Sequence, residues 1–391
     1  MARVMNSLMS SVFFIPLLLT SIDADINVAD FGAKADGKTD ASEAFLAAWA
    51  AACSSTKPTT IYLPAKKYFL GPVVFRGPCN NSRITLQMDA ILVAPDYQEM
   101  ASSENWIMFD VVDGLSVIGG YLDGRGSSFW KCKGVSNNCS AGSTSLAIYS
   151  SKNIVVQNLT SINSKLGHIL VHTCRDVVLQ GVRIRAPDQS PHTDGIHVQN
   201  SINVSILNAG IKTGDDCISI GQGTTNLWIE RVACGPGHGI SIGSLAKDLE
   251  EEGVENVVVQ SVVFTGTQNG VRIKSWGRPS NGYVKGVVFK KVLMKNVNNP
   301  IVIDQNYCPR NENCPYQDSG VEVNGVSYID IEGTSATQVA LNFDCSPTSP
   351  CKEISLQDIN LTYQNKPAQS SCQNAFGVAR GQIVPPSCLL K

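Results

Sequence analysis

The chain has 391 residues, and its 31 basic and 33 acidic side chains give a formal net charge of −2. This balance excludes a protein that binds nucleic acid through a general excess of cations, so attraction to a polyanion must come from a local basic cluster. The length fits either one large domain or two to three ordinary ones. Length alone does not choose between them, because elongated repeat folds grow without dividing into domains.

Residues 1–24 have the pattern of a secretory signal peptide. Arg3 supplies a positive start, VFFIPLLL forms a short apolar core, and small residues surround Ala24. A membrane anchor is the alternative, but this run is too short to span a bilayer comfortably, and no later stretch would span one. We predict a secreted protein with a mature domain at 25–391, free of the membrane after cleavage. We expect glycan on some of the N-x-S/T sequons, which begin at Asn80, Asn138, Asn158, Asn203 and Asn360.

The cysteine spacing predicts disulfides, and the thirteen cysteines fit an oxidising destination. The predicted pairs are Cys132/Cys139, Cys217/Cys234, Cys308/Cys314, Cys345/Cys351 and Cys372/Cys388, with Cys53/Cys79 as a sixth. Cys174 is left over in the strand-like LVHTCRDV, and we predict that it is a buried thiol. A zinc site is the alternative, but none of these pairs has C-x-x-C spacing.

One segment near the N-terminus has a convincing helical pattern. It is ASEAFLAAWAAACSS, residues 41–55, with Thr39 or Asp40 as its predicted N-cap. We expect this helix to cover the N-terminal end of the structure that the following repeats build, because that end would otherwise expose unpaired strand edges.

A short pattern recurs along the chain: a small or polar residue, then apolar, any, apolar, two more residues, and apolar. The units are NIVVQNL (153), DVVLQGV (176), NVSILNA (203), NLWIERV (226), NVVVQSV (256), GVVFKKV (286), GVSYIDI (325) and EISLQDI (353). Each unit alternates like a strand, is rich in Val and Ile, and is followed by turn-forming residues. The steps of 23, 27, 23, 30, 30, 39 and 28 residues are too irregular for a propeller or a leucine-rich repeat.

Irregular steps suit a parallel β-helix, in which each unit is one coil and insertions emerge as loops. Each coil buries its apolar side chains against the coils above and below, which gives one continuous core. A β-sandwich is the alternative, but hairpin signals such as N-G between adjacent strands are few. We therefore predict an all-β fold: a single parallel β-helix, or solenoid, with an N-terminal capping helix.

Four ionisable groups recur at the step of this solenoid. Asp194 lies in SPHTDGIHV, Asp216 in GDDC and His238 in GPGHGISIG, at intervals of 22 residues. Residues one coil apart in a β-helix are about 4.8 Å apart along the axis. We predict that Asp194, the pair Asp215 and Asp216, and His238 line up on three successive coils.

Two adjacent aspartates would point to opposite faces of a regular strand, but Gly214 permits a turn or bulge that aims both toward one cleft. Glycines flank the other two positions in the same way: Gly195, Gly237 and Gly239. Isolated turn-forming aspartates are the alternative, and four groups in register argue for a site. Such close carboxylates cannot all ionise cheaply, so at least one pKa should be raised. A raised acid beside ionised partners suits the cleavage of a glycosidic bond.

The next coil carries GVRIKSWG, in which Arg272 and Lys274 share one face of a strand. These cations would hold an anionic sugar, because Arg grips a carboxylate with two parallel hydrogen bonds. Salt bridges to Asp215 or Asp216 are the alternative. Tyr307, on the following coil, is predicted either to stack on a sugar ring or simply to pack.

The motifs TDG (193–195), GDDC (214–217), GHGISIGS (237–244) and RIK (272–274), in this order, resemble the polygalacturonases of glycoside hydrolase family 28, plant type. The likeness runs from VADFGAKADGKTD through IDQNYC, nearly the whole mature chain. It implies a right-handed parallel β-helix, an extracellular or cell-wall location, and a pectin or polygalacturonate substrate. It also implies hydrolysis of α-1,4-galacturonosyl bonds with inversion, without metal or other cofactor.

The resemblance also implies roles for the site residues. Asp215 would be the general acid, and Asp194 and Asp216 would hold and activate water as the base. His238 would tune the protonation of the acid. The substrate-binding residues would be Arg272 and Lys274 for the galacturonate carboxylate, with Tyr307 lining the sugar subsite.

One position departs from the family motif, which usually reads Asn-Thr-Asp. Here His192 replaces that Asn, and it is bulkier and able to become cationic. It can still donate a hydrogen bond to a sugar, so we expect activity to survive. We assign no catalytic role to His168, His172 or His197.

Other functions remain open from the sequence. A pectate lyase is another parallel β-helix enzyme for the same polymer, and it would need calcium and a basic proton acceptor. A pectin-binding, allergen-like homologue would bind the polymer without cleaving it. A relative acting on rhamnogalacturonan or a substituted galacturonan is the fourth possibility, although RIK favours plain galacturonan. Endo or exo action is open, and we expect a monomer because capped solenoids need no partner.

Overall fold

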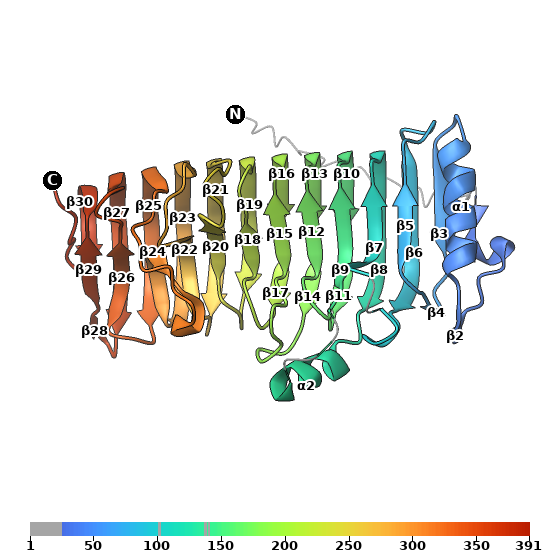
Figure 1. The fold of residues 1–391 in the computed structure, drawn as a ribbon, viewed down its shortest axis with the longest axis horizontal. Helices are drawn as coiled ribbons and strands as arrows, with labels where there is room; N and C mark the ends of the chain where they lie inside the picture. The colour runs from blue at the N-terminus through green and yellow to red at the C-terminus, as the bar shows by residue number, and fades with distance from the viewer. Residues whose placement is uncertain (1–25, 101–102, 137–138, 140) are drawn as a thin grey trace, which may run out of the picture.

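The computed structural model describes residues 26–100, 103–136, 139 and 141–391. Its strands stack into one elongated parallel β-helix that runs from the N-terminal coils to the C-terminal coils (Figure 1). The predicted signal peptide and the sequon at Asn138 lie outside the described residues.

Among the described residues the strands form two sheets, and the named strands pair in parallel except for β27 with β28. The larger sheet has 19 strands: β1 (Ile26–Asn27), β2 (Asp36–Asp40), β3 (Thr59–Leu63), β4 (Lys67–Phe69), β6 (Ile84–Val93), β8 (Asp113–Asp123), β10 (Lys152–Gln157), β11 (Thr160–Ile162), β13 (Arg175–Gln180), β14 (Arg183–Arg185), β16 (Ile202–Leu207), β17 (Gly210–Lys212), β19 (Thr225–Cys234), β21 (Val254–Thr265), β23 (Tyr283–Val297), β25 (Glu322–Ser335), β27 (Cys351–Tyr363), β28 (Lys366–Pro367) and β30 (Ala375–Val384).

The smaller sheet forms the face that bears the candidate site. It has 11 strands in the described part of the chain: β5 (Val73–Arg76), β7 (Asn105–Asp110), β9 (Thr144–Tyr149), β12 (Ile169–His172), β15 (Ile196–Gln199), β18 (Ile218–Ile220), β20 (Ile240–Leu245), β22 (Asn269–Trp276), β24 (Asn299–Tyr307), β26 (Val339–Asp344) and β29 (Gln369–Gln373). The helical segments are η1 (Val28–Phe31), α1 (Ser42–Ser54), α2 (Ser127–Val135) and η2 (Pro309–Asn311).

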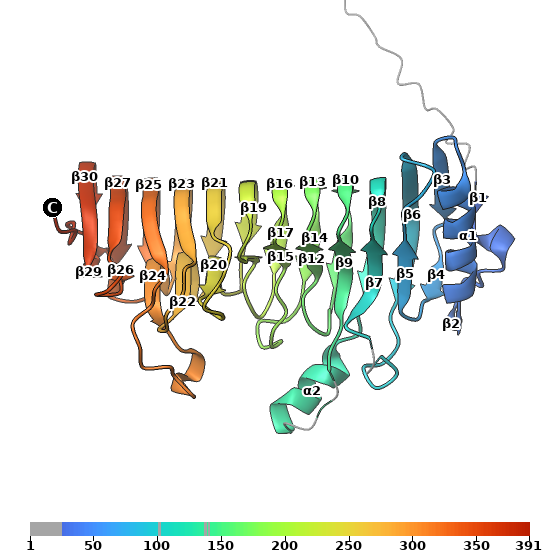
Figure 2. The same cartoon turned by 45° about the horizontal axis from the view of Figure 1, so that its top comes forward.

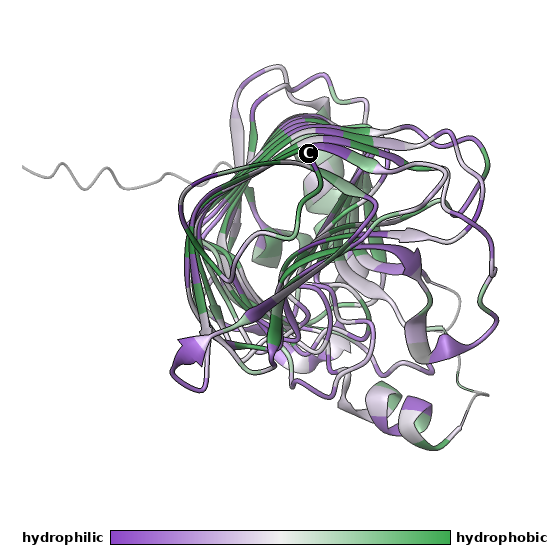
Figure 3. Ribbon diagram, turned by 90° about the vertical axis from the view of Figure 1, so that its left-hand side faces the viewer, coloured by the Kyte–Doolittle hydropathy of each residue, from purple (hydrophilic) through white to green (hydrophobic). Residues whose placement is uncertain are grey.

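The eight sequence repeats are confirmed as successive coils of the larger sheet. The first apolar positions of the first seven repeats pair directly in one buried column: Ile154, Val177, Val204, Leu227, Val257, Val287 and Val326. At about 25 cal/mol per Å² of apolar area removed from water, such columns are the main favourable contribution to folding. Viewed along the axis in Figure 3, the coils superpose, and hydrophilic residues are prominent in the loops that project outward.

The asparagine that begins several of the repeats has a structural reason. Asn203, Asn226 and Asn256 all have φ near +57°, in the left-handed region that asparagine tolerates. The amide of Asn226 donates to the side chain of Asn203 at 3.1 Å, and that of Asn256 donates to Asn226 at 3.2 Å. The repeat therefore marks both a turn and a hydrogen-bonded ladder between coils.

The predicted capping helix is present as α1, at the N-terminal end of the solenoid (Figure 1). Its buried face includes Phe45 and Trp49, and the Trp49 ring nitrogen donates to the backbone oxygen of Arg76 at 3.1 Å. The N-cap prediction was wrong, because the cap is Ala41, without a side-chain bond. The Asp40 carboxylate instead accepts the backbone N–H of Ser42 at 2.9 Å.

All six predicted disulfides form, and Cys174 is a buried free thiol. The sequence did not predict α2, which carries Cys132 of the bond to Cys139. Figure 2 shows α2 and the segment carrying η2 projecting from the same side of the solenoid. Among the described residues, no helix is long and apolar enough to cross a bilayer.

Candidate active site

Three neighbouring strands of the smaller sheet position the ionisable cluster. Ile196 of β15 pairs with Ile218 of β18, which pairs with Ile240 of β20. Asp194, Asp216 and His238 each lie two residues before these partners, so the structure brings them together on successive coils. The spacing of 22 residues therefore corresponds to a real column.

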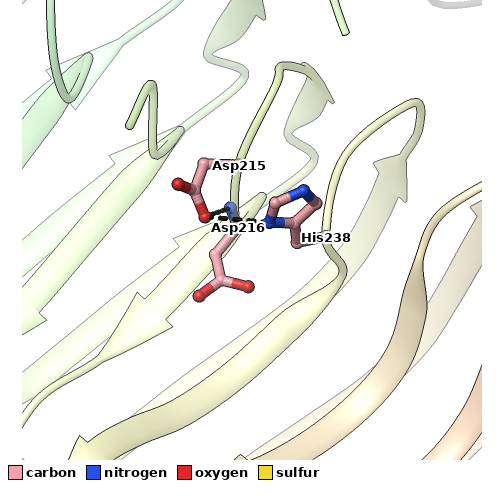
Figure 4. Close-up of side chains that lie close together, drawn as sticks. All are labelled: Asp215, Asp216 and His238. Atoms are coloured by element: carbon pink, nitrogen blue, oxygen red, sulfur yellow. Dashed lines mark hydrogen bonds and ion pairs between the residues drawn. The ribbon is translucent and has the colours of Figure 1, made fainter. Parts of the chain in front are cut away.

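The turn at Gly214 aims both adjacent aspartates at this column. A Cβ at Gly214 would collide with the backbone oxygen of Ser190, so only glycine fits. The backbone N–H of Asp216 then donates to Oδ1 of Asp215 at 2.9 Å. One carboxylate oxygen from each aspartate and one ring nitrogen of His238 lie within 4.8 Å of one another (Figure 4).

Asp216 is the buried anion of the cluster, with 2% of its side chain exposed. Its Oδ1 accepts from Arg272 at 3.0 Å and from the Ser241 hydroxyl at 2.8 Å, and its Oδ2 accepts from Lys274 at 2.8 Å. The salt bridges considered as the alternative role of these cations therefore exist in the free protein. A buried carboxylate without such partners would be very costly, so the cations also stabilise the site.

The pKa values of the other two aspartates shift in opposite directions. Burial, followed by the charges of Asp215 and Asp216, raises the pKa of Asp194 to about 7. Burial also opposes ionisation of Asp215, but the His238 hydrogen bond and charge, with the charge of Lys274, outweigh it and lower the pKa of Asp215 to about 2. The free site thus holds its proton on Asp194 and keeps Asp215 ionised.

These groups open into a cleft of about 640 Å³. Its lining includes Asp194, Arg272 and Lys274, together with Tyr307. The Tyr307 ring has the Lys274 amine 5.2 Å from its centroid and lies edge-on to Trp276 at 5.4 Å. The tyrosine therefore packs against the cations and still presents a face to the cleft.

His192 lies at the rim of the cleft, and its side chain is 68% exposed. Its φ of +56° is left-handed, a conformation that Asn, Asp and His adopt more readily than other side chains. Its Nδ1 is 3.7 Å from Oδ2 of Asp215. Histidine in place of Asn thus puts a titratable ring beside an ionised aspartate, and the left-handed backbone at this position accepts either residue.

Sequence reasoning predicted Arg272 but missed the two serines that hold the aspartates from the same column, Ser219 and Ser241. His197, Ser219, Ser241 and Arg272 pair directly across β15, β18, β20 and β22. The Ser219 hydroxyl is hydrogen-bonded to Oδ2 of Asp194 at 2.6 Å, and the Ser241 hydroxyl donates to Asp216 at 2.8 Å. The sequence did hold a signal for these residues, because a polar side chain follows Asp194, Asp216 and His238 at the same distance of three positions.

The histidines given no catalytic role fall into two groups. His168 is fully buried, and its Nδ1 bonds Ser161 at 2.9 Å, while His172 bonds Thr173 and lies outside the cluster. His197 differs, because it lines the cleft and bonds Ser219 at 2.7 Å.

These features define a parallel β-helix with a centre suited to acid–base chemistry in an open, cation-flanked cleft. The profile described as Glycosyl hydrolases family 28 matches residues 53–382, and the chain belongs to that family of glycoside hydrolases.

Several known proteins are similar to this chain over most of its length. A polygalacturonase of Prunus persica is 54% identical over 383 residues, covering 97% of this chain and 98% of that protein. An exopolygalacturonase of Platanus acerifolia is 41% identical, covering 92% and 96%. The crystal structure of an endo-xylogalacturonan hydrolase from Aspergillus tubingensis has the same fold, with a TM-score of 0.79 at 21% identity over 90% and 98% of the two chains.

Proposed function

We propose that this family 28 enzyme hydrolyses α-1,4-galacturonosyl bonds of pectin or polygalacturonate with inversion at the anomeric carbon. The observation that carries the proposal is the convergence of three aspartates and His238 beside two cations in one cleft. Identity of 54% to a polygalacturonase over nearly the full chain supports the same substrate.

In this mechanism Asp215 protonates the leaving glycosidic oxygen. It starts ionised, because His238 and Lys274 hold the pKa of its carboxyl at about 2. A galacturonate carboxylate bound by Arg272 and Lys274 brings negative charge to the site and offsets the cations. Asp215 then gains a proton from solvent in the open cleft more readily, so binding of the anionic substrate prepares the acid.

Asp194 and Asp216 hold and activate the attacking water on the opposite side of the bond. Asp216 is fixed by Arg272, Lys274 and Ser241, so it orients the water without moving. Asp194 must ionise to accept the proton of the water. Tyr307 and His192 contact sugars at the rim of the cleft.

We further propose secretion to the cell wall, with residues 1–24 as the signal peptide, 25–391 as one catalytic domain, and a monomeric mature enzyme. The six disulfides fit an oxidising compartment. The sequons at Asn80, Asn158 and Asn360 begin at exposed residues, which suits glycan attachment.

The test is a product profile from purified protein with de-esterified polygalacturonate and a chelator. We expect new reducing ends without the absorbance of unsaturated uronate, and product sizes separate monomer release from internal cutting. Unsaturated product that disappears on chelation would mean a lyase. Binding without product would mean a binding protein, with His192 as the first residue to revert.

A further inference from the structure

We propose that Ser219 and His197 form a proton relay that ionises Asp194 for its role as base, with Gln199 setting the tautomer of the histidine. The relay would make both residues positioning residues that act through Asp194. The inference rests on the proposed function in one respect, which is that the ionised Asp194 serves as a base in the hydrolysis.

The contacts form one unbroken chain across neighbouring strands β15 and β18. Ser219 Oγ lies 2.6 Å from Asp194 Oδ2, and His197 Nδ1 lies 2.7 Å from the same hydroxyl oxygen. His197 Nε2 lies 3.1 Å from Oε1 of Gln199. Ser219 is 3% exposed, so water does not compete freely for its hydroxyl.

The acceptor at Gln199 restricts the possible proton positions. An amide oxygen only accepts, so Nε2 of His197 carries a hydrogen and donates it. In the neutral imidazole Nδ1 is then a bare acceptor, Ser219 donates to it, and protonated Asp194 donates to Ser219. In the imidazolium Nδ1 donates to Ser219, and Ser219 donates to ionised Asp194.

These two arrangements differ by a balanced transfer. The proton on Asp194 Oδ2 passes to Ser219 Oγ while the hydroxyl proton of Ser219 passes to His197 Nδ1, leaving a carboxylate and an imidazolium. No proton enters from solvent, and the distances between heavy atoms stay within hydrogen-bond range. Asp194 is thereby freed to take the proton of the attacking water.

The surrounding charges set which arrangement is favoured. Burial raises the pKa of Asp194 to about 7 and lowers that of His197, so the free enzyme holds the neutral pair. The other charged or titratable groups near the relay come from several elements: Asp215 and Asp216 before β18, Lys274 on β22, His172 on β12, and Lys247 and Glu251 after β20.

The first test reads the histidine directly and needs no turnover. Nitrogen NMR of the full chain labelled in histidine, with His197→Asn to assign the resonance, should show Nε2 of His197 protonated from pH 4 to 8. Protonation of Nδ1 should depend on Asp194, so Asp194→Asn should shift its midpoint downward. A neutral ring with hydrogen on Nδ1, or a titration untouched by Asp194→Asn, would overturn the relay.

The second test uses matched variants in the hydrolysis assay. Ser219→Ala should lower kcat by roughly tenfold or more with little change in KM, because a positioned base contributes about 10²–10⁴-fold. It should also move the acid limb of the kcat/KM profile to higher pH, and Ser219→Thr should restore both. Asp188→Asn, which changes an exposed acid outside the relay, is the control and should leave the profile unchanged.

The outcomes separate this inference from the proposed function. A wild-type protein that releases no reducing ends fails the proposed function, while the NMR result still decides the relay. If Ser219→Ala is folded by its thermal transition and keeps the wild-type pH profile, Ser219 is structural and the relay is wrong.

Discussion

At Asp194, burial and two acidic neighbours work against the ionised form. Its pKa is about 7 in the folded protein against an ordinary value of 3.8, so the folded state binds more protons between these values. Its favourable contribution is present at low pH and is lost as the pH rises toward and through 7. For Asp215 the sign is opposite, and its contribution is lost as the pH falls from 3.8 toward 2.

Asp194→Asn should therefore stabilise the folded protein above neutral pH while removing activity. The amide can still hydrogen-bond to Ser219, and no buried charge must form. We expect the melting temperature to rise by roughly 1–3 °C at pH 8, with a smaller difference at pH 5. Calorimetry at both values checks this, with Asp188→Asn, an exposed acid in the preceding loop, as control. A variant less stable than wild type at pH 8 would contradict the assigned pKa.

His192→Asn should preserve or raise the rate. Asparagine suits the left-handed backbone at this position, and it removes a titratable ring 3.7 Å from Asp215. Steady-state assays should give kcat/KM at or above the wild-type value, whereas His192→Val should lower stability because a β-branched residue resists positive φ. A collapse of activity in His192→Asn alone would give the histidine an essential role.

At the scale of elements, strand β22 supplies two cations that both pair with one buried carboxylate, Asp216. Lys274→Met would leave Asp216 with Arg272 as its remaining cation. Breaking a buried ion pair costs about 3–5 kcal/mol when the remaining charge is left unpaired. Because Asp216 keeps Arg272, we expect a loss of stability below that range and a raised KM. Urea unfolding and substrate titration check both effects.

The matched control is the triple variant Asp216→Asn, Arg272→Met and Lys274→Met, which removes all three charges of this buried cluster. It should recover part of the lost stability while remaining inactive. If Lys274→Met has the same urea midpoint of unfolding as the wild type, the pairing with Asp216 contributes little to stability and the lysine serves only to bind substrate.

At the scale of the whole molecule, the solenoid depends on closed ends because its strands pair in parallel along the axis. Phe45 and Trp49 of α1 are buried at the N-terminal end. Phe45→Asp should loosen this cap and expose strand edges, which promotes association. Light scattering should detect oligomers and a lower melting temperature, while Leu46→Asp, at an exposed position of the same helix, should remain monomeric. A monomeric Phe45→Asp with wild-type stability would contradict the capping role.

Most of the coil architecture could be predicted from the sequence because pairing is between consecutive repeats. Ile154 and Val177 occupy the same position in consecutive repeats, and they pair directly in the larger sheet. The helix α2 could not be predicted, because its short sequence SSFWKCKGV buries little beyond Phe129 and is held by a disulfide. The relay through His197 was also missed, because its meaning depends on the side-chain direction of Ser219 and not on spacing alone.

The measurement that tests the central claim most directly is the turnover and binding of Asp215→Asn beside wild type. The variant keeps the shape of the side chain and removes the proton donor. We predict that release of reducing ends from polygalacturonate falls by at least about 10³-fold, while oligogalacturonate binding and thermal stability stay near wild type. Asp188→Asn should behave as wild type. Hydrolysis by Asp215→Asn at the wild-type rate would contradict the assignment of this cluster as the catalytic centre.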